Sequence, residues 1–204
     1  MSSLFDGPMP CPEHGSWGVK SLYDWRMDTA ANLVLVGPMG AGKSSIGKRL
    51  AHALMLEFVD ADRVLEARTG ATVADIFACE GEAGFRRRES SLLEELLTGQ
   101  GQLIATGGGV VLSEANRALL AREAYVIHLD VSVAEQLKRL ARDRTRPLLQ
   151  RDDREAVLHA MATDRAPLYA EVADLRLDTD GCTPDVACKQ LLPRIQNAWR
   201  GVAA

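Results

Sequence analysis

The sequence predicts an α/β fold with a mostly parallel sheet and helices on both of its faces. First, short apolar runs typical of buried strands alternate with longer segments of helical periodicity from residue 31 onward. Second, parallel strands separated by helices imply right-handed crossovers, which place the helices on the two faces of the sheet. Third, 204 residues with 47% hydrophobic and 25% charged side chains are enough for one soluble domain with a sizeable core.

The first strand and helix are expected at residues 31–37 and 42–54. The strand "ANLVLVG" is apolar and ends in glycine, and the helix places Ile46 and Leu50 on one face. A second, shorter strand at residues 57–62, "EFVDAD", runs into acidic side chains. These segments form the first strand–helix–strand unit of the fold.

A long helical stretch at residues 71–100 comes next. Thr72 is its expected N-cap, and Gly81 is expected to break it into two pieces. The third strand, residues 102–109, ends in three consecutive glycines. A helix at residues 113–122, capped by Ser113, is followed by a strand at residues 124–131. A helix at residues 132–142, capped by Ser132, a strand at residues 174–180 and a last helix at residues 184–199 complete the alternation.

Two segments stand apart from this alternation. Residues 1–30 hold three prolines and no clear period, so we expect a flexible or loosely packed extension to a single domain at residues 31–204. The segment "ARDRTRPLLQRDDRE" is highly charged and is interrupted by Pro147, which is the profile of a mobile surface loop. In an enzyme that binds nucleotides such a loop indicates a lid, here at about residues 142–154.

Composition narrows the class of partner and the compartment. The net charge of −4 and the pI near 5.6 weigh against a general nucleic-acid binder. Apolar runs stay short of the roughly 18 residues of a membrane helix, and the N-terminus lacks the order of a signal peptide. We interpret the four cysteines as free, reduced thiols because none shows C-x-x-C spacing: Cys11, Cys79, Cys182 and Cys188. We therefore expect a cytoplasmic protein without nucleic-acid or membrane partners, and we expect a monomer.

The stretch "GPMGAGKSS" satisfies the phosphate-loop pattern G-x-x-x-x-G-K-[ST] through Gly37, Gly42, Lys43 and Ser44. A predicted strand precedes the motif and a predicted helix follows it, as the pattern requires. The glycines let successive N–H groups point inward, and the helix N-terminus adds partial positive charge. Lys43 can reach the β- and γ-phosphates, and the Ser44 hydroxyl can bind Mg²⁺. The sequence therefore predicts a nucleoside triphosphate site but does not name the phosphate acceptor.

Asp60 and Asp62 stand two apart at the end of the second predicted strand. Strand alternation would send both side chains to the same side. One carboxylate would then hold Mg²⁺ through water, and the other would accept a proton from an alcohol. The alternative is a solvated acidic turn, and spacing alone leaves the two readings equal.

Three further features supply arginines and free backbone groups. Consecutive arginines of the helical run "FRRRES", at residues 85–90, point in different directions, so at most one or two can face a shared pocket. An ordinary run of surface charges is the simpler interpretation of this segment. The turn "TGGG" ends a strand at the sheet edge where ligands bind, and its third glycine exceeds what a tight turn needs. Arg146 lies in "RTRPLL" and Arg165 lies in "DRAPLY". Each arginine either stabilises the charge of the phosphoryl group during transfer or is an ordinary surface charge.

Taken in order, these motifs resemble the shikimate kinase family over roughly residues 31–200. The matching stretches are "GPMGAGKSSIGKRLA", "FVDADRVLEARTG", "ADIFACEGEAGFRRRE", "TGGGVV", "RTRPLL" and "DRAPLYAEVAD". The resemblance implies transfer of the γ-phosphoryl of ATP to the 3-hydroxyl of shikimate, in chorismate and aromatic amino-acid biosynthesis. It also implies a P-loop-type, three-layer fold with a five-stranded parallel sheet, a substrate-binding subdomain and a mobile lid.

The resemblance also implies roles for individual residues. The ATP phosphate loop matches Gly40, Ala41, Gly42, Lys43, Ser44 and Ser45, with Ser44 as the Mg²⁺ ligand and Asp60 acting on the metal through water. Asp62 matches the carboxylate that binds the shikimate hydroxyls and is the expected base. The pair that grips the shikimate carboxylate matches Arg86 and Arg165, with a backbone contact from Gly108. Arg146 matches the lid arginine on the phosphates, and the adenine contacts match Arg139 and the segment around Cys182 and Pro184.

Two alternative functions compete with this interpretation, and the sequence differs from the family pattern at two places. A related small-molecule kinase such as a gluconate kinase also takes a hydroxy-carboxylate, but the triple glycine with paired arginines fits the shikimate pattern better. A catalytically inactive homologue that regulates a partner is disfavoured by the complete set of charged residues. The departures are the N-terminal extension and "TDGCTPD", where Gly181 and Cys182 replace the polar or basic residues of many members, so backbone contacts to adenine are expected there.

Overall fold

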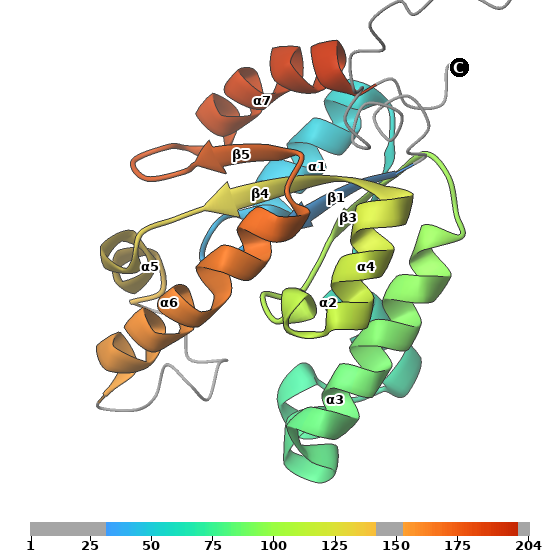
Figure 1. The fold of residues 1–204 in the computed structure, drawn as a ribbon, viewed down its shortest axis with the longest axis vertical. Coiled ribbons are helices and arrows are strands. Elements are labelled where there is room, and N and C mark those ends of the chain that lie inside the picture. The colour runs from blue at the N-terminus through green and yellow to red at the C-terminus, as the bar shows by residue number, and fades with distance from the viewer. Residues whose placement is uncertain (1–31, 142–152, 200–204) are drawn as a thin grey trace, which may run out of the picture.

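The computed structural model describes residues 32–141 and 153–199, which form a five-stranded parallel sheet with helices on both faces (Figure 1). The strand order along the sheet is β2-β3-β1-β4-β5. The strands are β1 (Asn32–Val36), β2 (Glu57–Asp60), β3 (Gln102–Ala105), β4 (Ala124–Asp130) and β5 (Leu175–Asp178). The predicted α/β class and the predicted parallel sheet are thus confirmed.

Helices connect the parallel strands along the chain, as a parallel sheet requires. They are α1 (Lys43–Leu54), α2 (Ala61–Thr69), α3 (Val73–Leu97), α4 (Glu114–Glu123), α5 (Val133–Arg139), α6 (Arg154–Val172) and α7 (Pro184–Ala198), and η1 (Val110–Leu112) is a 3-10 turn. The expected N-caps are confirmed: each hydroxyl accepts a backbone N–H three residues on, at Thr72, Ser113 and Ser132. Thr72 and Asp75 form a reciprocal capping box that sets the start of α3.

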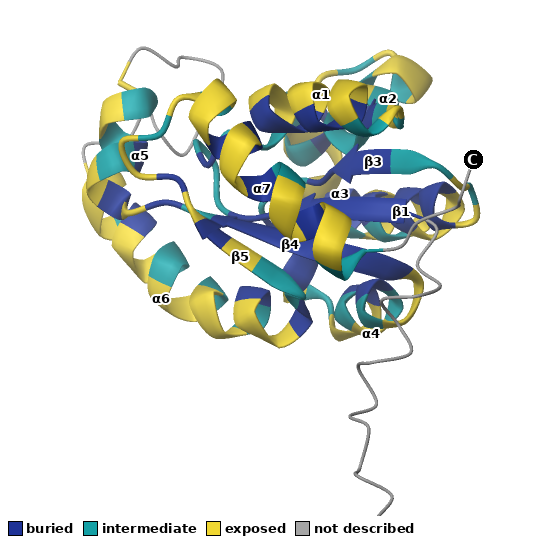
Figure 2. Ribbon diagram, turned by 90° about the horizontal axis from the view of Figure 1, so that it is seen from above, coloured by how far each residue is buried: buried dark blue, intermediate teal, exposed yellow. Residues whose placement is uncertain are grey.

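Three layers are visible when the molecule is seen from above (Figure 2). Alternate residues of β1 serve opposite layers: Leu33 and Leu35 pack with α1 and α7, whereas Val34 and Val36 pack with α3, α4 and α6. All four side chains are fully buried, as expected for a central parallel strand. The carboxyl ends of the strands are therefore fixed by a fully buried, well-packed core.

The long helix α3 bends at Gly81, which has a φ of 68° and interrupts the helical backbone. This left-handed conformation is open to glycine at little cost, so the expected break is confirmed. The bend sets the first turns of α3 apart from the longer second piece, which carries Phe85, Arg86 and Glu89.

Two helices were not among the expected elements. Helix α2 begins directly after Asp60, whose side chain caps it by accepting the Arg63 N–H, so the second strand stops two residues earlier than expected. Helix α6 runs through Pro167, a residue that argues against a helix interior. Pro167 itself lies at an exposed position of α6. The expected lid and N-terminal extension lie outside the described residues.

The central strand β1 has β3 on one side and β4 on the other, although the chain visits them later. Such a switch in strand order opens a crevice at the carboxyl ends of the strands. The phosphate-loop motif, the acidic pair and the triple glycine all follow strands at this edge. Within the described ranges, no helix is long and apolar enough to cross a membrane.

Candidate active site

The phosphate loop joins β1 to the N-terminus of α1. Gly37, Gly40 and Gly42 have φ values of 143°, 79° and 93°, which side chains rarely adopt. A Cβ on Gly37 would also lie 2.2 Å from the Leu129 carbonyl oxygen, so only glycine fits against β4. The Lys43 ammonium folds back over the loop and donates to the carbonyls of Gly37 and Pro38 at 2.7 and 2.9 Å. The loop therefore has the curled backbone of a phosphate cradle.

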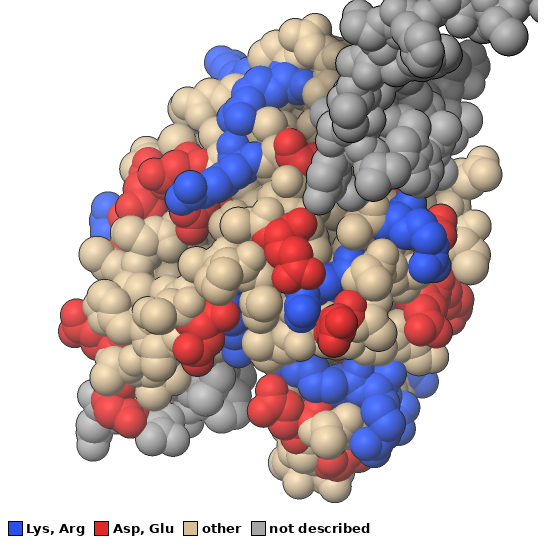
Figure 3. All heavy atoms as spheres, viewed as in Figure 1, with Lys and Arg blue, Asp and Glu red and all other residues tan. Residues whose placement is uncertain are grey.

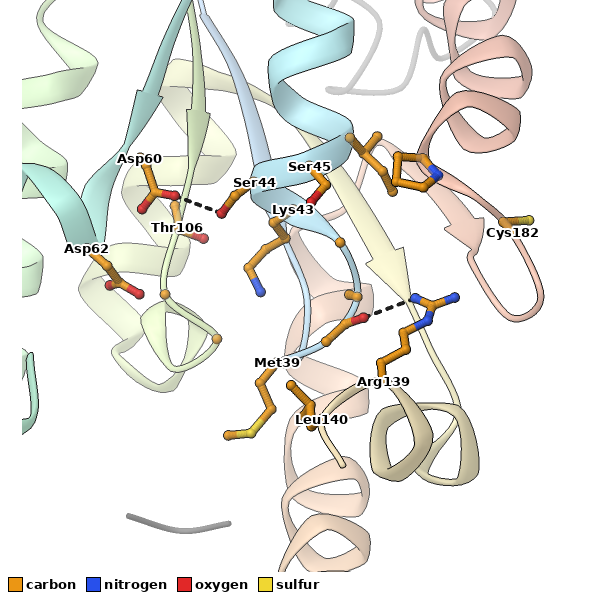
Figure 4. A pocket seen from close by; sticks show the side chains of 17 residues that line it. Met39, Lys43, Ser44, Ser45, Asp60, Asp62, Thr106, Arg139, Leu140 and Cys182 are labelled. Carbon is orange, nitrogen blue, oxygen red and sulfur yellow. Dashed lines mark hydrogen bonds between the residues drawn. The ribbon is translucent and has the colours of Figure 1, made fainter. Parts of the chain in front are cut away.

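A cavity of about 390 Å³ opens in front of this loop and brings together most of the residues expected to bind nucleotide and metal (Figure 4). Its lining includes Gly40 through Ser45, the acidic pair, the first two glycines of the triple-glycine turn, Arg139 and Cys182. The Ser44 hydroxyl donates to Asp60 at 2.7 Å, marked by a dashed line in the figure. Two oxygen ligands thus stand side by side next to the loop, which is the donor chemistry that a hard divalent cation prefers.

Asp62 reaches the same cavity by a different route from the expected one. Strand alternation was wrong as the reason, because Asp62 lies in the first turn of α2 rather than in β2. The sharp turn from Asp60 into the helix swings both carboxylates toward the loop (Figure 4).

The triple-glycine turn is built for close approach, and each glycine meets a different part of the site. A Cβ on Gly107 would lie 2.7 Å from Glu89 and 3.1 Å from Asp62. A Cβ on Gly109 would lie 2.2 Å from the Arg86 guanidinium, and one on Gly108 would lie 3.3 Å from the Gly37 carbonyl oxygen. Side chains at these positions would displace the Glu89 and Asp62 carboxylates and the Arg86 guanidinium from where they lie. The third glycine, unexplained by a plain turn, leaves room for Arg86 in its present position.

Arg86 is held by two carboxylates of its own helix. It donates to Glu89 at 2.6 Å and lies 3.3 Å from Glu82, while its guanidinium stacks near the Phe85 ring at 5.2 Å. Glu89 is 7% exposed and one of its oxygens has no partner, so burial raises the pKa of its carboxyl, against the opposing effect of Arg86. Sequence reasoning missed Glu89; its spacing of three residues from Arg86 was the available signal.

Arg165 approaches the triple-glycine turn from the opposite helix, α6. Its guanidinium donates to the Gly108 carbonyl at 3.2 Å, and it borders a second cavity of about 400 Å³ between the phosphate loop, β4 and α6. Arg86 and Arg165, distant in sequence, therefore meet at one glycine turn. Of the triplet at residues 86–88, Arg88 forms an ion pair with Glu80, in line with the expected surface role.

Arg139 closes the other end of the first cavity. It donates to the Gly40 carbonyl at 3.0 Å and to the hydroxyl of Thr179, and it lies 3.0 Å from Glu135 (Figure 4). It thereby ties the phosphate loop to the turn after β5, which carries Cys182. Cys79, Cys182 and Cys188 are free thiols. Arg146, Cys11 and the rest of the expected lid lie outside the described residues.

The surface charge is mixed on the face shown in Figure 3, where acidic and basic side chains alternate over most elements. Basic side chains gather over α3, the helix that carries the arginine triplet, and a second group lies over α7 and β5. At this edge of the sheet the phosphate loop lies opposite carboxylates, arginines and glycine backbone groups that could bind a second substrate. Within the described residues, this site and the fold define a P-loop protein of the kinase type.

Comparison with known proteins narrows the class. The family model described as shikimate kinase matches residues 39–196, and the chain belongs to the shikimate kinase family. Proteins named shikimate kinase from Stenotrophomonas maltophilia and Xanthomonas oryzae are 54% and 55% identical over 174 residues, covering 85% of this chain and 97% of each relative. A shikimate kinase from Acinetobacter baumannii, solved in complex with shikimate, is 42% identical with a TM-score of 0.77, covering 85% of this chain and 98% of that one.

Proposed function

We propose that this protein transfers the γ-phosphoryl group of ATP to the 3-hydroxyl of shikimate, giving shikimate 3-phosphate and ADP for chorismate and aromatic amino-acid biosynthesis. The observation that carries the proposal is the convergence of Arg86 and Arg165 on one glycine turn beside Asp62 and the phosphate loop. Two guanidinium groups match a carboxylate, and a carboxylate base matches an alcohol. The printed names of the relatives and of the shikimate complex support the same substrate.

The donor half comprises the phosphate loop and the residues beside it. Backbone N–H groups from Gly40 to Ser45 would bind the phosphates, and Lys43 would exchange its two loop carbonyls for phosphate oxygens. Arg139 and the backbone around Cys182 and Pro184 would border the adenine, since they line the far end of the cavity. Arg146, outside the described residues, would close over the phosphates as the lid arginine.

Ser44 and Asp60 would hold Mg²⁺, Ser44 directly and Asp60 through water. Their oxygens lie 2.7 Å apart beside the loop, and this donor set fits a hard cation that keeps several waters. The cation would offset negative charge on the transferring phosphoryl group. The protein's part is to place these two oxygens before ATP arrives.

The acceptor half comprises Asp62, Arg86, Arg165 and Gly108. The two arginines would clamp the shikimate carboxylate from opposite helices, and the turn would add a backbone contact at Gly108. Asp62, on the cavity wall opposite Lys43, would orient the alcohol and accept its proton. Most of the rate enhancement would come from this positioning, because phosphoryl transfer demands alignment and charge stabilisation.

We further propose that the enzyme acts as a monomer in the cytoplasm, as one domain from residue 31 with residues 1–30 as an extension. Free thiols at Cys79, Cys182 and Cys188 are typical of a reducing compartment. The mixed surface charge and the net charge of −4 support small anionic substrates rather than nucleic acid.

A coupled ADP-release assay with a substrate panel tests the proposal. The full chain is given Mg-ATP and either shikimate or gluconate. We expect turnover with shikimate well above that with gluconate and above the rate without acceptor. Turnover of gluconate alone would identify a different small-molecule kinase. ATP binding without turnover of either acceptor would favour the regulatory homologue.

A further inference from the structure

The carbonyl of Gly108 accepts two hydrogen bonds from helix α6. The Tyr169 hydroxyl donates to it at 2.5 Å, and the Arg165 guanidinium donates to it at 3.2 Å. A carbonyl oxygen has two lone pairs, so its capacity is filled. Of these two donors, Arg165 already has a proposed role with substrate, whereas Tyr169 has none.

The direction of this carbonyl fixes the direction of the next amide. A trans peptide is planar, so the Gly109 N–H points opposite to the Gly108 C=O and therefore away from α6. Arg86 approaches the same residue from α3, because its guanidinium lies 2.2 Å from where a Cβ on Gly109 would be. Among the described residues, the Gly109 amide donates to no acceptor. A free donor thus points toward the place proposed for the substrate carboxylate.

Glycine on both sides makes this peptide easy to turn over. Gly108 and Gly109 lack the Cβ atoms that restrict backbone angles, so a peptide flip meets little steric resistance. A flipped peptide would present the Gly108 carbonyl oxygen, instead of an N–H, to an anionic substrate. The two hydrogen bonds from α6 oppose that flip.

The two donors are not equivalent once substrate is bound. If Arg165 grips the substrate carboxylate, its bond to Gly108, already the longer of the two, weakens or is lost. Tyr169 has no such competing role: it is 3% exposed and stacks on His128 with ring centroids 4.8 Å apart. Burial raises the pKa of Tyr169 to about 12, so its hydroxyl remains a donor at any working pH.

We propose that Tyr169 is a positioning residue that keeps the Gly108–Gly109 peptide turned with its N–H toward the shikimate carboxylate while Arg165 moves to the substrate. The inference rests on the proposed clamp of Arg86 and Arg165 and adds a residue that touches no substrate. It assigns a function to the tyrosine in "DRAPLY" that sequence reasoning left unused.

Steady-state kinetics of Tyr169→Phe test it, because this change removes the hydroxyl and keeps the ring stacked on His128. We expect the KM for shikimate to rise about 3- to 10-fold, as for a lost hydrogen bond, with the KM for ATP unchanged. Tyr125→Phe is the matched control, since Tyr125 is 1% exposed in β4 and packs in the layer of α1 and α7. It should leave both KM values unchanged. Equal rises in both KM values, or no change in either, would overturn the proposal.

The amide resonances of Gly108 and Gly109 give a readout that a purely structural role would not move. In the wild type, shikimate should shift the Gly109 N–H downfield, and Tyr169→Phe should reduce that shift. Absence of the shift in the wild type overturns the proposal even if the variant fails to fold. Arg165→Ala distinguishes failure of the positioning role from failure of the proposed clamp. If Arg165→Ala raises the KM for shikimate and Tyr169→Phe does not, only the positioning role of Tyr169 is refuted. If neither variant changes the KM for shikimate, the clamp itself is refuted.

Discussion

The Ser44 hydroxyl donates a hydrogen bond of 2.7 Å to the Asp60 carboxylate across the gap between α1 and β2. The same carboxylate caps α2 through the Arg63 N–H. One aspartate therefore ends a strand, starts a helix and holds the hydroxyl of the phosphate loop in place. This relationship sets the first prediction.

Asp60→Asn should weaken the use of metal while preserving the fold, because asparagine also caps helices. We expect the Mg²⁺ concentration for half-maximal turnover to rise by about 10- to 100-fold, the range for lost outer-shell metal partners. The measurement is a Mg²⁺ titration at saturating ATP and shikimate. An unchanged titration midpoint would remove Asp60 from the metal site.

Asp62→Asn should reduce turnover by at least about 100-fold, because the amide cannot accept the alcohol proton. ATP binding, measured by calorimetry, should remain largely intact. Asp178→Asn, at the exposed last residue of β5, is the control and should keep full turnover. Near-normal turnover of Asp62→Asn would refute its assignment as the base.

Arg165→Ala should raise the KM for shikimate far more than the KM for ATP. The reason is that Arg165 lies on the glycine-turn side of the site, whereas the nucleotide phosphates belong to the loop. Steady-state kinetics with each substrate varied in turn make the comparison. Parallel rises in both constants would count against a carboxylate clamp.

His128 should make the protein sensitive to acid. It is 5% exposed, neither ring nitrogen has a hydrogen-bond partner among the described residues, and burial lowers its pKa to about 4. Because the unfolded chain has the ordinary value near 6.5, it binds more protons than the native state between pH 6.5 and 4, and native stability falls as the pH is lowered through that window. The charge of Asp130 opposes this lowering of the pKa, whereas the charges of Arg176 and Lys43 add to it.

His128→Phe removes this proton-linked loss. We expect its advantage in unfolding free energy over the wild type to grow by up to about 3 kcal/mol as the pH falls from 7 to 4. Denaturant unfolding at several pH values measures it. His159→Phe, at an exposed position of α6, should show no such growth. Wild-type and His128→Phe curves that run parallel with pH would contradict the shifted pKa.

Met55 ends α1 in the left-handed region with a φ of 56°, and its side chain is 89% exposed. Glycine adopts this conformation without the Cβ penalty, so Met55→Gly should stabilise the protein by about 0.5–1 kcal/mol. Ala53→Gly, exposed inside the same helix, should instead destabilise it by about 1 kcal/mol. Thermal unfolding of both variants is the check, and destabilisation by both would show that Met55 bears no strain.

Local patterns predicted the features that depend on neighbours in the chain. The strand "ANLVLVG", the caps at Thr72, Ser113 and Ser132 and the break at Gly81 follow from periodicity and turn chemistry within a few residues. Where local chemistry pointed two ways, prediction failed. Asp62 was expected at a strand end and lies in the first turn of α2, and α6, which contains Pro167, was not among the expected elements.

By itself the sequence determined the alternation of strands and helices, the phosphate cradle and the ordered motifs of the family, since each is written in contiguous residues. Only the tertiary structure decided which distant groups meet. The bend of α3 and the approach of α6 bring Arg86 and Arg165 to one turn, and the buried Glu89 and Tyr169 stand behind them. Packing of helices on the sheet brings Arg165 and Tyr169 of α6 to the turn that Arg86 approaches from α3, so no spacing along the chain encodes that meeting.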